Sequence, residues 1–431
     1  MQIVNVSRSG PLQGTITVPA DKSITHRAII FSSLAEGDSR VKNPLRAEDC
    51  MRTLSAFRIM GVEVEDAGKD ILIKGSGLAG LKEPEDVIDC GNSGTTARLL
   101  CGLLSGQPFF SVLTGDASLR QRPMDRVTAP LSSMGAKFSG RNRGKLLPMA
   151  VQGVSSLKAI RYVSPVPSAQ VKTAVLLAGL FCDGVTEVVE PGKSRDHTER
   201  MLPAYGAGLE IEGLSVRLSG RQGLRGMDIT VPGDISSAAF FIVAALILPG
   251  SEVLIENVGV NPTRTGILDI LKNMGGSVGI LNRREVSGEP VADIHVRHSP
   301  LKGVTIEGDL VPRAIDEFPA ICVAAALADG ETRISGVSEL RVKESDRIAS
   351  MAEGLRSMGV DVDESPDGMV ISGQERLLPG VFESRGDHRI AMAMAVAALK
   401  ADGESKIENA GCIATSYPGF WDSLRSLQGI G

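Results

Sequence analysis

Basic and small polar side chains gather in short segments of this chain that have the composition of anion-binding sites. The segments read DKSITHR, GNSGTTAR, QRPMDR, PSAQ, KSRDHTER, RVKESDR and GDHR. Several join a polar or glycine-containing turn to an Ala- and Leu-rich stretch, a pattern that predicts a helix start. Unpaired N–H groups and about half a positive charge at a helix start favour phosphate or carboxylate. Binding of small polyanions is therefore the first chemistry to consider.

Three of these segments suggest where their helices begin. Ser23 is the predicted N-cap of the first, with Lys22 immediately before it and Arg27 on the same helix face. Pro123 suits a first helical turn, and a helix beginning at Ser345 would place Arg347 in its first turn. Each segment alone is most often structural, since capping serines and solvated arginines are common. Their joint occurrence in one chain favours function.

The elements that must position these residues recur along the sequence. Met-Gly pairs precede alternating apolar segments at residues 60, 134, 274 and 358, and Tyr205-Gly206 occupies the same slot. Before each pair, a polar turn leads into an apolar helix. The pattern predicts six copies of an α+β unit of roughly 70 residues, the last truncated. VPADKS and VPGDIS mark equivalent starts, so we expect two lobes of three units with a boundary near residues 231–233.

Composition excludes several classes of protein. The 431 residues carry a net charge of −5, and aromatic residues make up only 3%. Both values argue against nucleic-acid binding. The longest apolar run, residues 238–248, is too short to cross a bilayer, and the N-terminal stretch lacks the features of a signal peptide. Six dispersed cysteines without a CxxC motif predict reduced, mostly buried thiols, so we expect a cytoplasmic protein.

Metal and cofactor sites are not indicated by the sequence. His295 and His298 fall in a strand-like stretch and are expected to form a surface pair rather than a ligand pair. No GxGxxG motif opens a βαβ unit, so a nicotinamide cofactor is not expected. We therefore predict no metal and no organic cofactor.

Taken in order, the motifs resemble the 5-enolpyruvylshikimate-3-phosphate synthase family over essentially the whole chain. The resemblance rests on VPADKSITHR, GNSGTTAR, QRPMDR, PSAQVKTA, RDHTER, AIDEFP, RVKESDR and GDHRIAMA. It implies an α+β fold, described as an inside-out α/β barrel. This fold has two similar lobes of three βαβαββ-type units, hinged with the active site in the cleft between them. The first lobe would comprise residues 20–231, and the second residues 1–19 plus 232–431.

The resemblance also implies an activity. The enolpyruvyl group of phosphoenolpyruvate would pass to the 5-hydroxyl of shikimate 3-phosphate through a tetrahedral addition–elimination intermediate, with release of phosphate, in the shikimate pathway. No cofactor is needed, because phosphoenolpyruvate supplies the reactive group. A monomer is expected, with glyphosate as a possible inhibitor.

Residue roles follow from the matching motifs alone. The implied catalytic residues are Lys22, Asp316 and Glu344. The residues implied to bind shikimate 3-phosphate are Lys22, Ser23, Arg27, Ser168, Ala169, Gln170, Arg195, Asp316 and Lys343. Those implied to bind phosphoenolpyruvate are Lys22, Asn92, Gly94, Thr95, Arg122, Gln170, Lys343, Arg347 and Arg389. Asp316 would contact the attacking hydroxyl, and Glu344 would protonate the methylene carbon.

Two positions give opposite indications about glyphosate. Many family members carry a Lys shortly before the final aromatic-Pro pair, whereas this chain has Thr415 in IATSYP. That difference resembles a divergent branch that includes tolerant enzymes. Gly94, by contrast, matches the sensitive pattern. The degree of tolerance stays open, and partial sensitivity is the expectation.

The sequence argues against three other interpretations. UDP-N-acetylglucosamine enolpyruvyl transferase is similar in fold but uses a loop cysteine, and the ASLRQRPM region has none. RNA 3′-phosphate cyclase, a more distant relative in fold, is disfavoured by the acidic charge and the few aromatic residues. A non-catalytic phosphometabolite-binding protein would gain nothing from carboxylates at Asp316 and Glu344.

Overall fold

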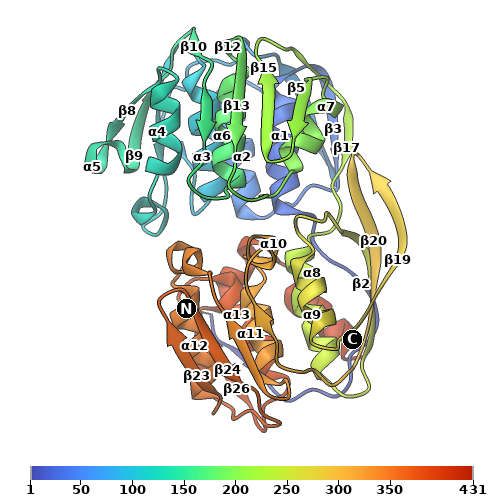
Figure 1. Cartoon of the computed structure of the whole chain (residues 1–431). Helices are drawn as coiled ribbons and strands as arrows, with labels where there is room; N and C mark the ends of the chain where they lie inside the picture. Colours follow the sequence, from blue (N-terminus) through green and yellow to red (C-terminus); the bar gives the residue numbers. More distant parts are fainter. Residues whose placement is uncertain (1, 430–431) are drawn as a thin grey trace. The chain divides into compact units, whose positions relative to one another are not determined.

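The computed structural model describes residues 2–429 and divides them into two compact units (Figure 1). Unit 1 comprises residues 2–19, 232–285 and 290–429, and unit 2 comprises residues 20–231 and 286–289. The chain thus leaves unit 1 after Pro19 and returns to it at Pro232. Each unit encloses a hydrophobic core of its own.

Three sheets of four or more strands belong to unit 2. The first follows the order β16-β3-β5-β4 with β17 also beside β3, and comprises β3 (Ala35–Lys42), β4 (Glu63–Ala67), β5 (Asp70–Ser76), β16 (Leu224–Arg225) and β17 (Asp228–Thr230). The second follows the order β6-β7-β9-β8 and comprises β6 (Ile88–Asp89), β7 (Phe110–Thr114), β8 (Lys137–Gly140) and β9 (Leu146–Gln152). The third follows the order β11-β13-β15-β14 and comprises β11 (Arg161–Val163), β13 (Val185–Val189), β14 (Leu209–Glu212) and β15 (Ser215–Ser219). A two-stranded pair joins β10 (Leu157–Lys158) to β12 (Cys182–Asp183).

The helices of unit 2 fall into a buried and a more exposed set. The buried set is α1 (Lys22–Leu34), α3 (Gly94–Ser105) and α6 (Ala169–Gly179). The others are α2 (Glu48–Ile59), the 3₁₀ turn η1 (Leu119–Gln121), α4 (Asp125–Ser133), the short turn α5 (Arg141–Gly144) and α7 (His197–Ala204). Helices α3 and α6 pack so closely that a Cβ added at Gly102 would lie 2.2 Å from the Ala174 carbonyl oxygen. Glycine is therefore required at that crossing.

Unit 1 also has three sheets. The first follows the order β19-β20-β18-β2 and comprises β2 (Gln13–Thr17), β18 (Glu252–Gly259), β19 (Ser277–Val286) and β20 (Glu289–Arg297). The second follows the order β21-β22-β24-β23 and comprises β21 (Thr305–Ile306), β22 (Glu331–Ile334), β23 (Asp361–Ser365) and β24 (Gly368–Ser372). The third follows the order β1-β26-β25 and comprises β1 (Val4–Val6), β25 (Val381–Glu383) and β26 (Ser405–Glu408). The parallel pairing of β2 with β18 ties the N-terminal segment into this unit.

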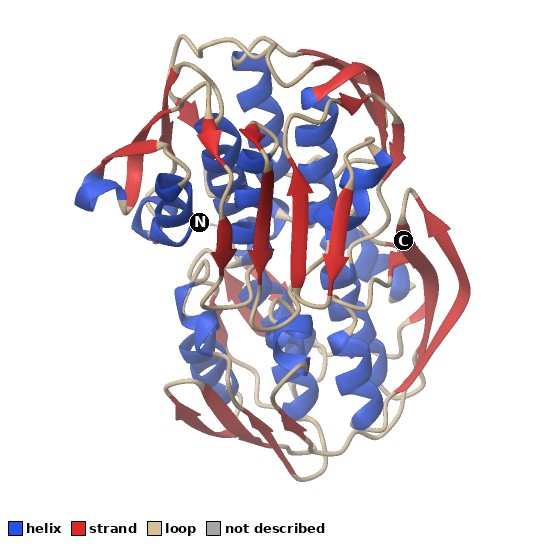
Figure 2. Ribbon diagram, turned by 45° about the horizontal axis from the view of Figure 1, so that its top comes forward, coloured by secondary structure: helices blue, strands red, loops and turns tan. Residues whose placement is uncertain are grey.

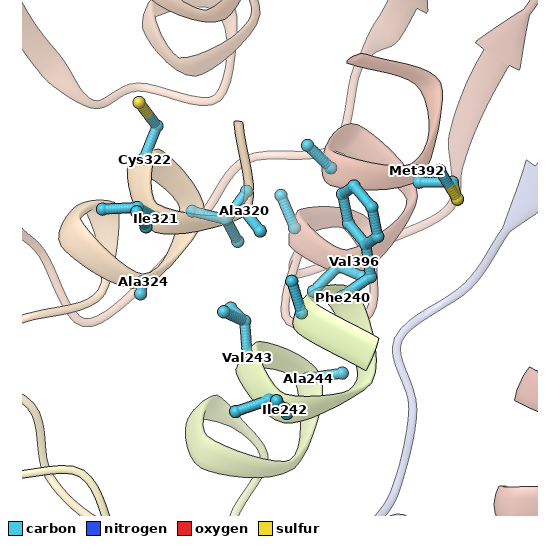
Figure 3. Packing of buried hydrophobic residues seen from close by; sticks show 14 of the residues in the cluster. Phe240, Ile242, Val243, Ala244, Ala320, Ile321, Cys322, Ala324, Met392 and Val396 are labelled. Atoms are coloured by element: carbon cyan, nitrogen blue, oxygen red, sulfur yellow. The ribbon is translucent and has the colours of Figure 1, made fainter. Parts of the chain in front are cut away.

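Three helices of unit 1 are buried along their whole length, namely α8 (Ile235–Ile247), α11 (Phe318–Ala326) and α13 (His388–Ala398). Their Ala-rich faces pack against one another, with Phe240, Val243, Ala320 and Val396 at the contact (Figure 3). The remaining helical segments are α9 (Gly266–Asn273), α10 (Leu310–Ala314), η2 (Ser338–Val342), α12 (Arg347–Ser357), η3 (Ala410–Thr415) and α14 (Phe420–Leu427). Within each unit the strands lie outside the helices (Figure 2). A helix apolar on all faces is expected to be buried in this way.

The recurring Met-Gly pairs end one helix in each repeat. Met60 caps α2 and Met358 caps α12, and the glycine that follows each has a φ of 86°. A left-handed residue just after a helix is a common helix stop, and glycine adopts it without a steric penalty. Each pair then leads into a β-hairpin, β4–β5 or β23–β24. The sequence period thus reflects a repeated local stop signal.

Candidate functional site

Helix α1 begins one residue before the predicted N-cap. Asp21 is the cap, and its side chain accepts a hydrogen bond from the Ile24 N–H at 2.9 Å. The prediction of Ser23 as the cap was wrong. Asp21, two residues earlier, caps a helix at least as well and has the extended backbone angles of a cap residue. Lys22 and Ser23 are therefore the first two helical residues.

Lys22 is held by a carboxylate of the next helix. Its Nζ lies 3.0 Å from Asp49 Oδ2, and the two side chains are 14% and 10% exposed. Sequence reasoning missed Asp49, which lies in the first turn of α2 and carries no motif of its own. The contact fixes the ammonium group at the start of α1.

Arg27 joins three helices of unit 2. Its Nε donates to Thr198 Oγ1 of α7 and its Nη2 to Thr173 Oγ1 of α6, both at 2.8 Å, and its Nη1 donates to the Ser23 carbonyl. Burial lowers the pKa of this guanidinium to about 10, with Glu199 opposing the shift, so it stays charged at neutral pH. Of its five N–H donors, these three bonds leave two for a ligand.

Arg122 lies against the start of α3. Its Nη2 donates to Asn92 Oδ1 at 2.6 Å, and the Asn92 amide donates in turn to Asp116 Oδ2. A Cβ added at Gly94, the first residue of α3, would lie 3.4 Å from Arg122 Nη1 and 2.8 Å from Arg98 Nη1. Gly94 thus leaves the space that these guanidinium groups occupy.

Pro123 was predicted to lie in a first helical turn, and this prediction was wrong. Helix α4 begins at Asp125 with Met124 as its cap, and the Pro123 carbonyl accepts a bond from Arg98 Nη2 at 3.2 Å. The 3₁₀ turn η1 ends at Gln121 and Arg122 is extended, so the chain leaves the helical conformation before α4 starts. Helix α4 therefore starts later than predicted, but Arg122 still lies against the start of α3.

The starts of α3 and α6 share a polar link. Gln170 Nε2 donates to Thr95 Oγ1, and Arg98 Nη1 donates to Gln170 Oε1, each at 3.0 Å. Ser168 caps α6 by accepting from the Val171 N–H, and Ala169 is the first helical residue. Arg98 was missed by sequence reasoning, although its place four residues after Gly94 could have indicated it. Arg195 lies half-buried just before α7.

Unit 1 gathers its predicted residues around Arg347. Its side chain is 1% exposed and contacts three carboxylates, with Nε 2.8 Å from Asp387 Oδ2, Nη1 3.2 Å from Asp316 Oδ1, and Nη2 on Glu344. Burial acts to lower the pKa of this guanidinium, but the carboxylates outweigh it and the net shift is upward. Arg347 is therefore a permanent cation.

Helix α12 begins at Arg347 and not at Ser345, the start considered from the sequence. Asp346 is the cap and accepts from the Ala349 N–H at 3.0 Å. Asp346, one position after Ser345, takes the cap role, whereas at α1 the cap is Asp21, two positions before Ser23. Arg347 still lies in the first turn.

Asp316 lies between two guanidinium groups. Arg389 Nη2 is 3.8 Å from Asp316 Oδ2, on the opposite carboxylate oxygen from Arg347. Arg389 is buried in the first turn of α13, whose cap is Asp387. Lys343 is 26% exposed, and desolvation lowers the pKa of its ammonium group while Asp316 opposes the shift. Asp387 was missed, although it stands inside the GDHR motif.

The predicted residues thus form two clusters, one in each unit. The unit 2 cluster contains Lys22, Ser23, Arg27, Asn92, Gly94, Thr95, Arg122, Ser168, Ala169, Gln170 and Arg195. The unit 1 cluster contains Asp316, Lys343, Glu344, Arg347 and Arg389. The first offers cations and helix starts to an anion. The second adds carboxylates, which can move protons.

Cysteine, metal and membrane features give little further chemistry. Five cysteines are buried as predicted, and burial raises the pKa of Cys101, inside α3, to about 12. Over residues 2–429, no group of three or more potential ligands is arranged to hold a metal ion. His295 pairs with Glu252, whereas His298 contacts the Leu246 carbonyl. No helix within that range is both long and apolar enough to span a bilayer.

Comparison with known proteins gives one family. The model for EPSP synthase (3-phosphoshikimate 1-carboxyvinyltransferase) matches residues 6–424. A 3-phosphoshikimate 1-carboxyvinyltransferase of Geotalea uraniireducens is 60% identical over 420 residues, covering 97% of this chain and 98% of the relative. One from Geobacter sulfurreducens is also 60% identical, covering 95% of each chain.

Solved structures agree with that result. The EPSP synthase of Acinetobacter baumannii superposes with a TM-score of 0.89 at 46% identity, covering 99% of this chain and 98% of the other. The enolpyruvyl transferase NikO of Streptomyces tendae has a TM-score of 0.77 at 16% identity, covering 99% and 97%. The NikO likeness concerns the fold alone.

Proposed function

The chain belongs to the EPSP synthase (3-phosphoshikimate 1-carboxyvinyltransferase) family, and from this premise we propose how its two clusters perform the reaction. The protein transfers the enolpyruvyl group of phosphoenolpyruvate to shikimate 3-phosphate and releases phosphate. We assign shikimate 3-phosphate to the α1 and α6 starts together with Arg27 and Arg195, and phosphoenolpyruvate to Arg122, Arg347 and Arg389. The proposal requires both clusters to contact the same pair of substrates.

Charge balance supports this assignment. Each substrate carries a carboxylate and a phosphate of about −1.5 to −2, so the pair brings about five to six negative charges. Seven cations are assigned to meet them, namely Lys22, Arg27, Arg122, Arg195, Lys343, Arg347 and Arg389. Asp49 already pairs with Lys22, and three carboxylates pair with Arg347. Arginine suits the task because its planar fork pairs with two oxygens at once.

The proton transfers are assigned to three side chains. In the addition step, the 5-hydroxyl oxygen bonds to C2 of phosphoenolpyruvate. Its proton leaves to Asp316, assisted by Lys22, while Glu344 gives a proton to C3. In the elimination step, the C2–O bond to phosphate breaks and the proton held by Asp316 passes to the departing phosphate. C3 returns a proton to Glu344, which restores the double bond and regenerates both carboxyl groups. The observation that carries this assignment is that Asp316 lies between Arg347 and Arg389, while Glu344 contacts the same Arg347 guanidinium.

The rival transferase lacks its acid in this chain. A loop cysteine would have to lie near Arg120–Arg122, whereas the nearest cysteine in the sequence, Cys101, is buried within α3. We further propose that the protein acts as a cytoplasmic monomer, with reduced thiols, and that glyphosate inhibits it. Gly94 supports inhibition, and Thr415 is expected to weaken it.

The test is a phosphate-release assay on the purified protein. Phosphate should appear from phosphoenolpyruvate when shikimate 3-phosphate is present, and the amount should match the enolpyruvyl product. Release that requires UDP-N-acetylglucosamine would establish the rival activity. Binding of both metabolites without release would establish a non-catalytic binding protein.

A further inference from the structure

We propose that Glu190, paired with Lys172, is a positioning residue that sets the geometry of Ser168 and Arg195 for the phosphate of shikimate 3-phosphate. The inference rests on the function proposed above. Lys172 lies within the PSAQVKTA segment, but the resemblance gives neither Lys172 nor Glu190 a role, and neither residue is assigned to touch a substrate. Their effect would pass through the residues that they hold.

Lys172 is the centre of a buried charge cluster in unit 2. Its Nζ, in the first turns of α6, lies 2.7 Å from Glu190 Oε2 and 2.6 Å from Glu199 Oε1. The three side chains are only 3 to 5% exposed. Glu190 follows β13 directly, and Glu199 lies in the first turn of α7. The cluster therefore joins the end of strand β13 to two helix starts.

Glu190 uses both carboxylate oxygens to hold the neighbouring backbone. Oε1 accepts the Ser168 N–H at 2.9 Å, and Oε2 accepts the Ser194 hydroxyl at 2.8 Å as well as the Lys172 ammonium. Ser168 is the cap of α6, and Ser194 directly precedes Arg195. One side chain thus fixes two segments that are assigned to the same phosphate.

This contact determines which donors the α6 start presents. The Ser168 N–H is used by Glu190, and the Val171 N–H is used by Ser168 Oγ. Helix geometry gives the N–H groups of Ala169 and Gln170 no acceptor within the helix. These two groups and the Ser168 hydroxyl hydrogen are then directed to a ligand. A phosphate with several acceptor oxygens matches such a set.

Stability alone does not account for the cluster. A buried ion pair typically adds little folding stability compared with apolar residues of similar volume, although removing one partner of the pair lowers the stability strongly. A purely structural cluster would make Glu190 and Glu199 equivalent, since each balances the same ammonium. Only Glu190 bonds Ser168 and Ser194, however, whereas Glu199 Oε2 has no hydrogen-bond partner among the described residues. The two glutamates therefore form a matched pair for experiment.

The experiment compares Glu190→Gln with Glu199→Gln in the full-length protein. Each substitution removes one charge next to Lys172 and keeps the side-chain shape. The dissociation constant of shikimate 3-phosphate is measured by titration calorimetry, and the KM of phosphoenolpyruvate at saturating shikimate 3-phosphate. We expect Glu190→Gln to weaken shikimate 3-phosphate binding about tenfold or more, with the KM of phosphoenolpyruvate changed less than about threefold. Glu199→Gln should change both by less than about threefold.

Equal losses in the two variants, or an unchanged dissociation constant in Glu190→Gln, would overturn the proposal. If Glu190→Gln does not fold, Ser194→Ala decides, because it removes one bond to Glu190 and leaves the charges intact. That variant should weaken shikimate 3-phosphate binding about fivefold, and an unchanged value would equally overturn the proposal. Wild-type protein that neither binds nor converts shikimate 3-phosphate would instead refute the proposed function.

Discussion

Acidification should destabilise unit 2 through His26, which is buried in the second turn of α1. Burial lowers the pKa of this imidazole from 6.5 to about 3, with Asp49 opposing and Lys22 adding to the shift. Nδ1 lies 2.7 Å from Thr53 Oγ1, whereas Nε2 has no hydrogen-bond partner among the described residues. Protonation would create a buried cation with an unsatisfied N–H, which is why the folded state resists it.

The size of the effect follows from the shift. Between pH 6.5 and about 3 the unfolded chain carries a proton on His26 that the folded protein does not. The free energy of unfolding therefore falls as the pH falls, by about 1.4 kcal/mol per pH unit once below pH 6.5. From pH 7 to pH 5 the loss from this group is about 2 kcal/mol. In a unit of this size that corresponds to about 4–8 °C in Tm.

Urea denaturation of wild type and His26→Gln at pH 7, 6 and 5 measures this term, because all other titrating groups are common to both proteins. The stability difference between wild type and variant should shift by about 2 kcal/mol against wild type on going to pH 5. His295→Gln is the control, since His295 lies in an exposed pair with Glu252 in unit 1. A difference that stays constant with pH would mean that His26 titrates normally in the folded protein and would refute the reasoning.

Three further outcomes concern the site. Gly94→Ala should raise the KM of phosphoenolpyruvate about tenfold with little change in shikimate 3-phosphate binding. The reason is that the new Cβ would lie 2.8 Å from Arg98 Nη1 and 3.4 Å from Arg122 Nη1. Steady-state kinetics check this prediction, and an unchanged KM would contradict it. Asp316→Ala should lower kcat about a hundredfold or more, and near-normal turnover with both substrates would remove Asp316 from the proton transfer. Desolvation lowers the pKa of Lys343, so its cationic form is lost at lower pH than in a free lysine. The KM of phosphoenolpyruvate should therefore rise on the alkaline side, and Lys343→Arg should flatten that rise. Identical profiles for the two proteins would argue against a role for the ammonium group.

Local signals made much of the fold predictable from the sequence. The Met-Gly and Tyr-Gly pairs are helix stops encoded within a few residues, so their period could be read directly. The apolar helices α8, α11 and α13 were recognisable because buried helices are apolar on every face. The exact helix starts were less predictable, because DKS and SDR each offer two residues able to cap.

The partners of the site residues could not be predicted in the same way. Asp49, Arg98 and Asp387 act through contacts with residues far away in the sequence, at 27, 72 and 40 positions respectively. Their roles depend on which helices pack together, and no local pattern specifies that. Motif resemblance supplied the residues that we assign to the substrates, whereas the groups that hold those residues required the structure.

The most direct measurement is an experimental structure of the protein with shikimate 3-phosphate and a non-reactive analogue of phosphoenolpyruvate. We expect the phosphate of shikimate 3-phosphate to contact Ser168 and Gln170, and a single analogue molecule to contact both Arg122 of unit 2 and Arg389 of unit 1. An analogue held by one cluster while the other contacts neither ligand would contradict the account.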